Sequence, residues 1–144
     1  MTRKNLLDLL ETYQTTKKRI DHLEEEIYKY KSLAISLGDS IGSGMPGSHN
    51  SGNARYTKAI ENLTDVEEAH LKEISNLKES LDVTKRYIDL EKKPHRRLIL
   101  QMRYIDGLSV SKIAIETDRS NKTIYKLYNT SIKNILSEIN NTGA

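Results

Sequence analysis

The chain has 144 residues, of which 30% are charged; it contains no cysteine and carries a formal net charge of +3 at pH 7. This length suits one or two small domains. The lack of cysteine excludes a disulfide framework and a thiolate zinc site, which fits a cytoplasmic location. No stretch approaches the length of a membrane-spanning helix, so we expect no contact with a membrane.

The positive charge is concentrated in the last third of the chain. Residues 1–91 contain 13 Lys/Arg against 16 Asp/Glu, a net charge of −3, whereas residues 92–144 contain 10 against 4, a net charge of +6. A basic segment of this kind is the electrostatic footprint expected of a DNA-contacting part. The alternative interpretation is an ordinary solvated surface rich in Lys and Arg.

Residues 3–37 are predicted to form one long helix with a coiled-coil seam. With Leu6 at position a of a heptad, nine of the ten a and d positions are apolar or aromatic, and Thr16 is the one weak layer. These positions hold Leu6, Leu9, Tyr13, Thr16, Ile20, Leu23, Ile27, Tyr30, Ala34 and Leu37. Because a seam of two residues per heptad leaves one side of the helix apolar, it needs a partner helix.

Residues 54–91 repeat the pattern and offer a partner within the chain, although the same seam could also pair between two chains. Their apolar positions are Ile60, Leu63, Ile74, Leu77, Leu81 and Ile88. The two helices are therefore predicted to fold back on each other as an antiparallel hairpin. The exposed half of each apolar stripe favours a second copy, so we expect a homodimer or higher oligomer formed through residues 3–37 and 54–91.

Two polar residues, Glu67 and His70, interrupt the second seam. The neighbouring Val66 and Leu71 are expected to fill the interruption. Polar residues in such a seam either lie at its edge or fix register and oligomer order, and the sequence leaves both roles open.

The two long helices are separated by a Gly/Ser-rich stretch, residues 38–53, which holds five of the seven glycines. This composition predicts a flexible loop. The loop is long for a hairpin turn, and loops of this length are either disordered or functional, for example in contact with DNA or RNA polymerase.

Residues 91–97 join the hairpin to the basic C-terminal part. Pro94 disfavours helix at the preceding residue and suits the first turn of a new helix. Four cations are candidates for binding backbone phosphates, namely Lys92, Lys93, Arg96 and Arg97. The predicted division is a hairpin and oligomerisation region at residues 1–91 and a helix-turn-helix DNA-binding domain at residues 92–144.

Residues 98–136 have the pattern of a helix-turn-helix preceded by a further helix. Apolar residues at three-residue steps run to Ile105 and are closed by Asp106 and Gly107, as at a left-handed helix end. Ser109 is placed to cap a short second helix with Val110, Ile113 and Ala114 facing inward.

A turn at residues 117–119 leads to a third helix, which Ser120 is placed to cap. Its inner stripe repeats at three to four residues and comprises Ile124, Leu127, Ser131, Ile132 and Ile135. Tyr104 and Tyr128 are expected to be buried or half-buried. The whole chain is thus predicted to be all-α, a long hairpin followed by a three-helix helix-turn-helix domain.

The outward residues at the start of the third helix are amides, hydroxyls and cations, the groups that contact base edges in a major groove. The candidate base-reading residues are Asn121, Lys122, Thr123, Tyr125 and Lys126. Asn129 is a weaker candidate for the same outward face. Further candidates for phosphate contact are Ser109, Lys112 and Arg119.

The run Tyr104-x-x-Gly107-Leu108-Ser109-x-x-x-Ile113-Ala114, followed by Ser120-x-x-Thr123-Ile124-Tyr125, resembles region 4 of the sigma-70 factors. The whole arrangement is similar to the small late-gene transcription regulators of Gram-positive phages, the ArpU, RinA and LlgA types. The resemblance implies an activator of late or structural genes that binds double-stranded DNA near a promoter in a bacterial host cell. It places the base-reading positions on the same five residues.

No catalytic role is expected. Residues 38–42 match the G-x-S-x-G pattern of serine hydrolases, but that pattern works only in a turn between a strand and a helix, and no strand is predicted. The four histidines are scattered and lack the spacing of metal ligands, so we expect neither a metal nor a cofactor.

The leading hypothesis is a sequence-specific regulator that binds double-stranded DNA and itself, with host RNA polymerase as a further candidate partner. One alternative is a phage DNA-packaging recognition subunit, which combines the same elements and would form a ring. Another is an adaptor that docks on RNA polymerase through its helix-turn-helix without binding DNA.

Overall fold

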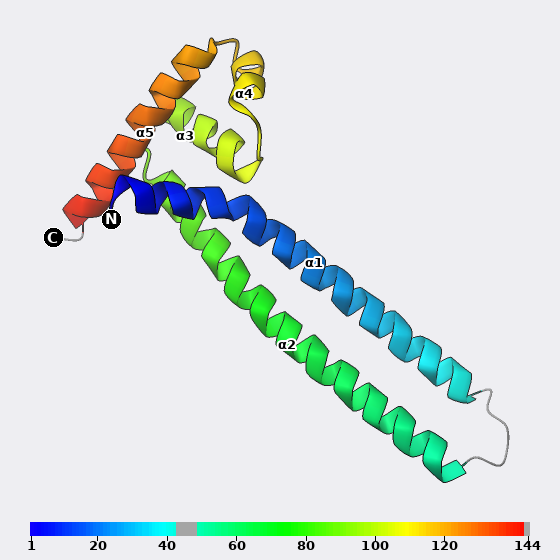
Figure 1. The fold of residues 1–144 in the computed structure, drawn as a ribbon. Helices are drawn as coiled ribbons and strands as arrows, with labels where there is room; N and C mark the ends of the chain where they lie inside the picture. The colour runs from blue at the N-terminus through cyan, green and yellow to red at the C-terminus, as the bar shows by residue number, and fades with distance from the viewer. Residues whose placement is uncertain (43–48, 143–144) are drawn as a thin grey trace. The chain divides into compact units, whose positions relative to one another are not determined.

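The computed structural model describes residues 1–42 and 49–142, which are almost entirely helical (Figure 1). The elements are α1 (Arg3–Gly42), α2 (His49–Asp89), α3 (Pro94–Leu100), the π-helical turn η1 (Gln101–Ile105), α4 (Val110–Glu116) and α5 (Asn121–Thr142). No strand occurs within these residues, so the predicted all-α class is confirmed.

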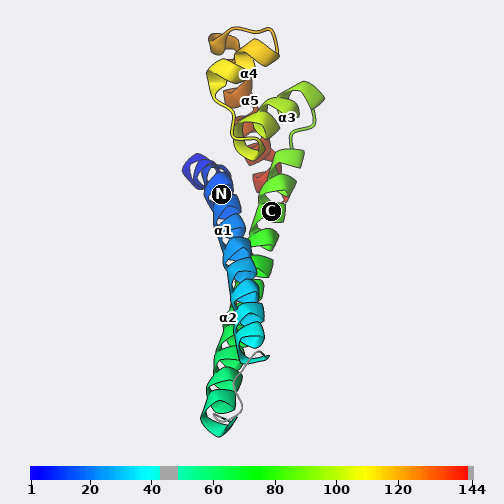
Figure 2. The same cartoon turned by 90° about the vertical axis from the view of Figure 1, so that its right-hand side faces the viewer.

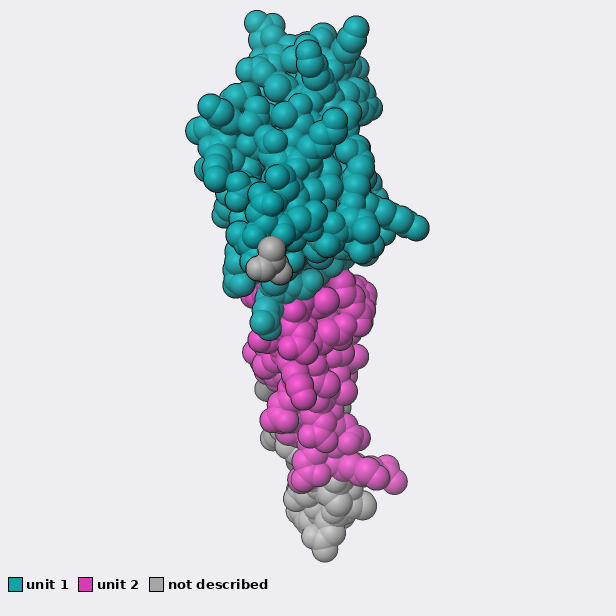
Figure 3. Space-filling model, turned by 90° about the vertical axis from the view of Figure 1, so that its left-hand side faces the viewer, with its two compact units in different colours: residues 1–17, 79–144 teal, residues 18–78 magenta. Residues whose placement is uncertain are grey.

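Residues 18–78 form one compact unit (Figure 3). Within it α1 and α2 run antiparallel and side by side (Figures 1 and 2). Of the predicted seam residues in this unit, Ile20, Leu23, Ile27 and Ile74 are buried, and the others that are described, Tyr30, Ala34, Ile60, Leu63 and Leu77, are half-buried. The side chain of Leu37 lies outside the described residues. Ion pairs flank the seam, for example Arg19 Nε with Glu73 Oε1 at 3.2 Å. The apolar seam is thus covered within one chain, as the hairpin prediction required.

The interruption in the second seam differs from the expectation. His70 turns towards α1, where its ring hydrogen-bonds the carboxylate of Glu26 and lies 6.0 Å from the ring of Tyr30, measured between centroids. Leu71 is exposed instead of filling the gap, so that part of the prediction is wrong. A half-buried imidazole is tolerated here because its nitrogen has a hydrogen-bond partner.

The loop predicted at residues 38–53 is shorter than expected, because α1 continues to Gly42 and α2 begins at His49. Extending an existing helix by one residue adds a backbone hydrogen bond at little entropic cost, which offsets the low helix propensity of glycine. The remainder of the predicted loop, residues 43–48, lies outside the described residues.

The second compact unit consists of residues 1–17 and 79–144. A core joins the start of α1 and the end of α2 to the C-terminal helices, and it contains Leu6, Leu10, Ile88, Leu100, Tyr104, Ile132 and Ile135. Leu10 is more deeply buried than the predicted seam residue Leu9, because this part of α1 packs against more than one helix. The compact units therefore do not coincide with the expected division between residues 91 and 92.

The C-terminal helices are α3 with its continuation η1, α4 and α5. They share a second core, formed by Ile99, Met102, Ile113, Ala114 and Ile124. Gly107 ends the first of them with φ of +72°, as the predicted left-handed end requires. The turn between α4 and α5 contains Asp118 with φ of 54°. Two helices joined by so short a turn and packed through apolar residues have the connectivity of a helix-turn-helix.

Candidate nucleic-acid interface

The start of α5 is held in place by a cap and by the core. Ser120 Oγ accepts a hydrogen bond from the backbone N–H of Thr123 at 3.1 Å, so the predicted cap is present. One residue further on, Ile124 is buried against α3 and α4. The first two turns of α5 are therefore fixed, and one side of them faces solvent.

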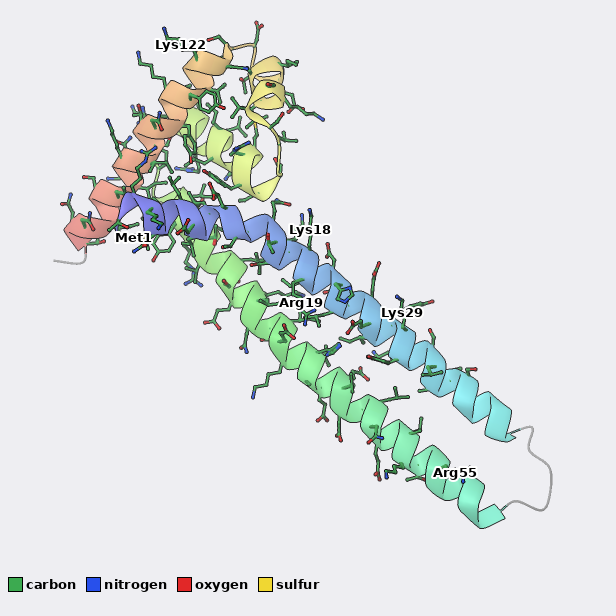
Figure 4. The ribbon with its side chains drawn as sticks, in the orientation of Figure 1. Met1, Lys18, Arg19, Lys29, Arg55 and Lys122 are labelled. Atoms are coloured by element: carbon green, nitrogen blue, oxygen red, sulfur yellow. The ribbon has the colours of Figure 1, made fainter. Side chains whose placement is uncertain are left out.

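The solvent side carries four of the five predicted base-reading residues. Asn121, Lys122 and Lys126 are exposed, and the side chain of Tyr125 is 54% exposed. Lys122 projects outward from the first turn of α5 in Figure 4. These side chains present an amide, two ammonium groups and an aromatic hydroxyl on one helix end, the groups that contact base edges and phosphates.

Thr123 differs from its neighbours. It is half-buried, and its hydroxyl lies 2.9 Å from Ser120 Oγ, so the cap occupies it. Asn129, further along α5, accepts a hydrogen bond from the Arg3 guanidinium at 2.9 Å. Both residues are engaged by intramolecular contacts that their helical spacing did not indicate.

The helix α4 lies next to the exposed side of α5 and adds polar residues to it. Ser109 caps α4 by accepting a hydrogen bond from the backbone N–H of Lys112 at 3.2 Å. Lys112 and Arg119 are exposed. An open groove between α4 and α5 is lined by Ser111, Ala114, Ile115, Asp118, Arg119, Ser120 and Asn121.

Two of the groove residues were missed by the sequence prediction. Ser111 Oγ accepts a hydrogen bond from the side-chain amide of Asn121 at 3.4 Å, which orients one predicted base-reading group. Ile115 is 80% exposed. The signal for Ile115 is its position outside the inward pattern of α4, whereas the Ser111 contact depends on how two helices pack.

The four cations proposed to bind phosphate before the helix-turn-helix are not equivalent. Lys92 Nζ pairs with a carboxylate of α5 at 3.0 Å, Arg96 pairs with Glu91 Oε1 at 3.2 Å, and Arg97 Nε donates to the backbone carbonyl of Glu91 at 2.9 Å. Lys93 is exposed and has no ion pair within the described part of the chain. Among the described contacts, Lys93 is therefore the one of the four whose side chain is left without an intramolecular partner.

Glu91 accepts the contacts from Arg96 and Arg97, and no pattern in the sequence indicates its burial. Its side chain is only 1% exposed, and the carboxylate accepts hydrogen bonds from the Lys93 backbone N–H, Arg96 and Asn134. Burial acts to raise the pKa of Glu91, but these hydrogen bonds outweigh it and lower the pKa below its ordinary value. The ionised carboxylate thus ties the end of α2 to α3 and α5.

Within residues 1–42 and 49–142, no three His, Asp or Glu side chains gather in a way that would hold a metal ion. The predicted G-x-S-x-G match lies in helix α1 and not between a strand and a helix. None of the described helices contains an apolar stretch long enough to cross a bilayer.

Comparison with known proteins identifies a family. A family model described as "Protein of unknown function (DUF1492)" matches residues 45–136, which is more than half of the chain. The chain belongs to this family. The DUF1492 match includes α2, α3 and α4, and it ends within α5 after the exposed residues at the start of that helix. No curated protein and no solved structure matches the chain.

Proposed function

We propose that this protein is a sequence-specific, double-stranded DNA-binding transcription regulator that activates phage late genes in the cytoplasm of a bacterial host. The observation that carries the proposal is the exposed polar and cationic end of α5, whose opposite side is buried against α3 and α4. A recognition helix needs this combination, because base contacts require both a rigid helix and free donors and acceptors. The resemblance to sigma-70 region 4 and to phage late-gene regulators supports the same function.

In this proposal the two groups of side chains have different tasks. The base edges in the major groove are read by Asn121, Lys122, Tyr125 and Lys126. The phosphates on either side are bound by Lys93, Lys112 and Arg119. The protein acts as a homodimer, so two recognition helices engage two half-sites about one helical turn apart. Host RNA polymerase is the further partner of an activator that binds near a promoter.

Selection of duplexes from a random library tests the proposal. The full-length protein should enrich one sequence motif, and binding to it should resist competitor DNA. Asn121→Ala and Lys126→Ala should each weaken binding to that motif by about 5-fold to 100-fold, which corresponds to the discrimination of one bidentate base contact.

Matched controls on the same helix are Asn141→Ala and Lys133→Ala, which remove an exposed amide and an exposed ammonium group far from the start of α5. Both should keep the enriched motif. The proposal is wrong if no motif is enriched, and the reading face is wrongly assigned if Asn121→Ala and Lys126→Ala enrich the wild-type motif unchanged.

The exposure of Ile115 favours a second candidate, an adaptor that docks on RNA polymerase through the groove between α4 and α5. An isoleucine that is mostly in water contributes more to a protein contact than to a phosphate contact. Ile115→Glu should abolish binding to immobilised core polymerase under this hypothesis. Polymerase binding by a wild-type protein that enriches no DNA motif would favour the adaptor over the regulator.

A further inference from the structure

The unit formed by residues 1–17 and 79–144 contains a cavity of about 210 Å³ between the helix-turn-helix and the first helix of the chain. Its walls come from α1, α3, η1, α4 and α5. A cavity of roughly 150 Å³ with apolar walls is large enough to hold benzene. The space is therefore sufficient for one aromatic ring.

One part of the cavity is apolar and already formed. Ile99, Ile113 and Ile124 line it, and each of these side chains is buried in the core that holds the three C-terminal helices together. Val110, which is half-buried, lines the same part. Because these residues are fixed by packing, a ring could enter without rearrangement of the core.

Tyrosines form a second part of the wall. Tyr104 is buried and Tyr128 is half-buried, as expected from the sequence, and their hydroxyls are hydrogen-bonded to each other. Tyr125 also lines the cavity, although more than half of its side chain is exposed. Aromatic walls favour an aromatic occupant, since offset or edge-to-face ring contacts add to the free energy of apolar burial.

Two opposite charges complete the lining. Glu11 from α1 and Arg103 from η1 are both exposed, and neither forms an ion pair with a residue that the structure describes. The Arg103 guanidinium donates one long hydrogen bond, of 3.4 Å, to the backbone carbonyl of Leu108. A carboxylate and a guanidinium thus border the aromatic and apolar space and retain hydrogen-bonding capacity.

We propose that this cavity binds a small aromatic zwitterion of the size of an aromatic amino acid. The ring occupies the apolar part between the isoleucines and the tyrosines, the ligand carboxylate pairs with Arg103, and the ligand ammonium group pairs with Glu11. A ligand with a single charge would gain one ion pair and would meet a like charge at the other residue, which is unfavourable. The paired charges therefore select a zwitterion over an aromatic acid or an aromatic amine.

Isothermal titration calorimetry of the full-length protein tests the ligand class with three probes that share one ring. L-phenylalanine carries both charges, 3-phenylpropionate carries only the carboxylate, and phenethylamine carries only the ammonium group. L-phenylalanine should bind with a Kd of about 1 mM or below. The Kd of each of the other two probes should be higher by about 10-fold or more. L-alanine, which lacks the ring, should not bind.

Charge-removing variants locate the site. Arg103→Gln and Glu11→Gln should each weaken L-phenylalanine binding by about 10-fold, the effect of one lost ion pair in a partly closed site. Arg103→Gln should not weaken the binding of phenethylamine, because that probe has no carboxylate. The matched controls Arg86→Gln and Glu68→Gln change exposed charges that do not line the cavity, and both should bind L-phenylalanine like the wild type.

Filling the cavity provides an independent variant. Val110→Phe places a ring in the apolar part and should abolish L-phenylalanine binding. Far-ultraviolet circular dichroism checks that every variant keeps its helix content. The proposal is overturned if L-phenylalanine does not bind at about 10 mM, if all three probes bind equally, or if Arg103→Gln and Glu11→Gln bind L-phenylalanine with wild-type affinity.

The position of Tyr125 links the cavity to the reading face, and this link rests on the proposed function. Tyr125 lines the cavity and is also one of the residues proposed to read bases. Bound L-phenylalanine should therefore change the affinity for an enriched duplex by about 3-fold or more, and Val110→Phe should remove the response. Unchanged DNA affinity at saturating L-phenylalanine would overturn the link, whereas ligand binding by a protein that enriches no motif would count only against the regulator.

Discussion

Gln14 of α1 donates a hydrogen bond from its side-chain amide to the backbone carbonyl of Tyr104 at 3.0 Å, across 90 positions of the chain. The same amide also donates to the carbonyl of Ile105. Both carbonyls lie at the end of η1, where a helix leaves its last acceptors without partners. One side chain of α1 thus completes the helix that precedes the helix-turn-helix.

Replacing Gln14 should therefore destabilise the protein from a distant position. Gln14→Ala leaves two half-buried carbonyls without a donor, and we expect the free energy of unfolding to fall by about 1–3 kcal/mol. Urea denaturation followed by circular dichroism measures the change. The neighbouring exposed substitution Thr15→Ala is the control and should stay within about 0.5 kcal/mol of wild type. Equal stability of the two variants would contradict the role given to Gln14.

Gly107 should resist replacement because of its backbone. Its φ of +72° lies in the left-handed region, where an L side chain costs about 1–2 kcal/mol. An added Cβ would also lie 3.1 Å from Gln14 Cδ. Gly107→Ala should lower the free energy of unfolding by about that amount, and Gly107→Asn by less, because asparagine adopts this conformation more readily.

The two causes at Gly107 can be separated in a Gln14→Ala background. The side-chain contact is then absent, so any remaining loss caused by Gly107→Ala reports the backbone. A double variant no less stable than Gln14→Ala alone would show that the left-handed conformation carries little cost here.

Glu91 should make stability depend on pH. Its pKa is lowered in the folded protein from the ordinary value of 4.5, so its contribution is present above about pH 4.5 and is lost as the pH falls through the folded pKa. Glu91→Gln should be less stable than wild type at pH 7 by about 1–3 kcal/mol, because the charged hydrogen bond from Arg96 to the carboxylate is lost. The difference should shrink towards pH 3.

Denaturation of wild type and Glu91→Gln at pH 7, 5 and 3 checks this sign. Glu138→Gln is a suitable comparison, since Glu138 pairs with Lys92 nearer the surface. A gap between wild type and Glu91→Gln that stays constant or widens on acidification would contradict the assignment of an ionised, hydrogen-bonded carboxylate.

Two neighbouring cations should have separable effects. Arg96→Ala removes a partner of the buried Glu91, so it should cost about 2 kcal/mol or more of stability. Lys93→Ala removes an exposed ammonium group and should leave stability within about 0.5 kcal/mol. If Lys93 contacts a phosphate, its loss should reduce the slope of log affinity against log salt by about 1.

Fluorescence anisotropy with an enriched duplex at several salt concentrations measures that slope, and urea denaturation measures stability. The distinction drawn between the two residues fails if Arg96→Ala is as stable as wild type. It fails equally if Lys93→Ala unfolds more readily than Arg96→Ala.

The helices themselves were predictable because their signals are local. The caps at Ser109 and Ser120 and the left-handed end at Gly107 depend on a few neighbouring backbone groups, which adjacent residues specify. The seam of α1 was predictable for a similar reason, since a heptad period places its residues on one side whatever they pack against.

The extent of the candidate site was less predictable. Lys93 and Arg96 are both cations in the same short segment of the sequence. In the described structure Lys93 has no ion pair, whereas Arg96 forms an ion pair with the buried carboxylate of Glu91. Helical spacing also predicts an outward side chain for Thr123, but its hydroxyl is hydrogen-bonded to the capping residue Ser120. Periodicity gives the direction of a side chain and says nothing of the partners that it meets.

Periodicity and contacts within a few residues are enough to specify the all-helical class and the order of caps and turns in residues 98–136, but an apolar seam alone does not decide whether the two long helices pair within one chain or between two. Long-range packing, in contrast, set the burial of Glu91, 43 positions from its partner Asn134, and the completion of η1 by Gln14. The same packing joined residues 1–17 to residues 79–144 in one unit. These features depend on which distant surfaces meet, because the free energy of burying a side chain is set by the groups that surround it in the folded protein and not by its neighbours along the chain.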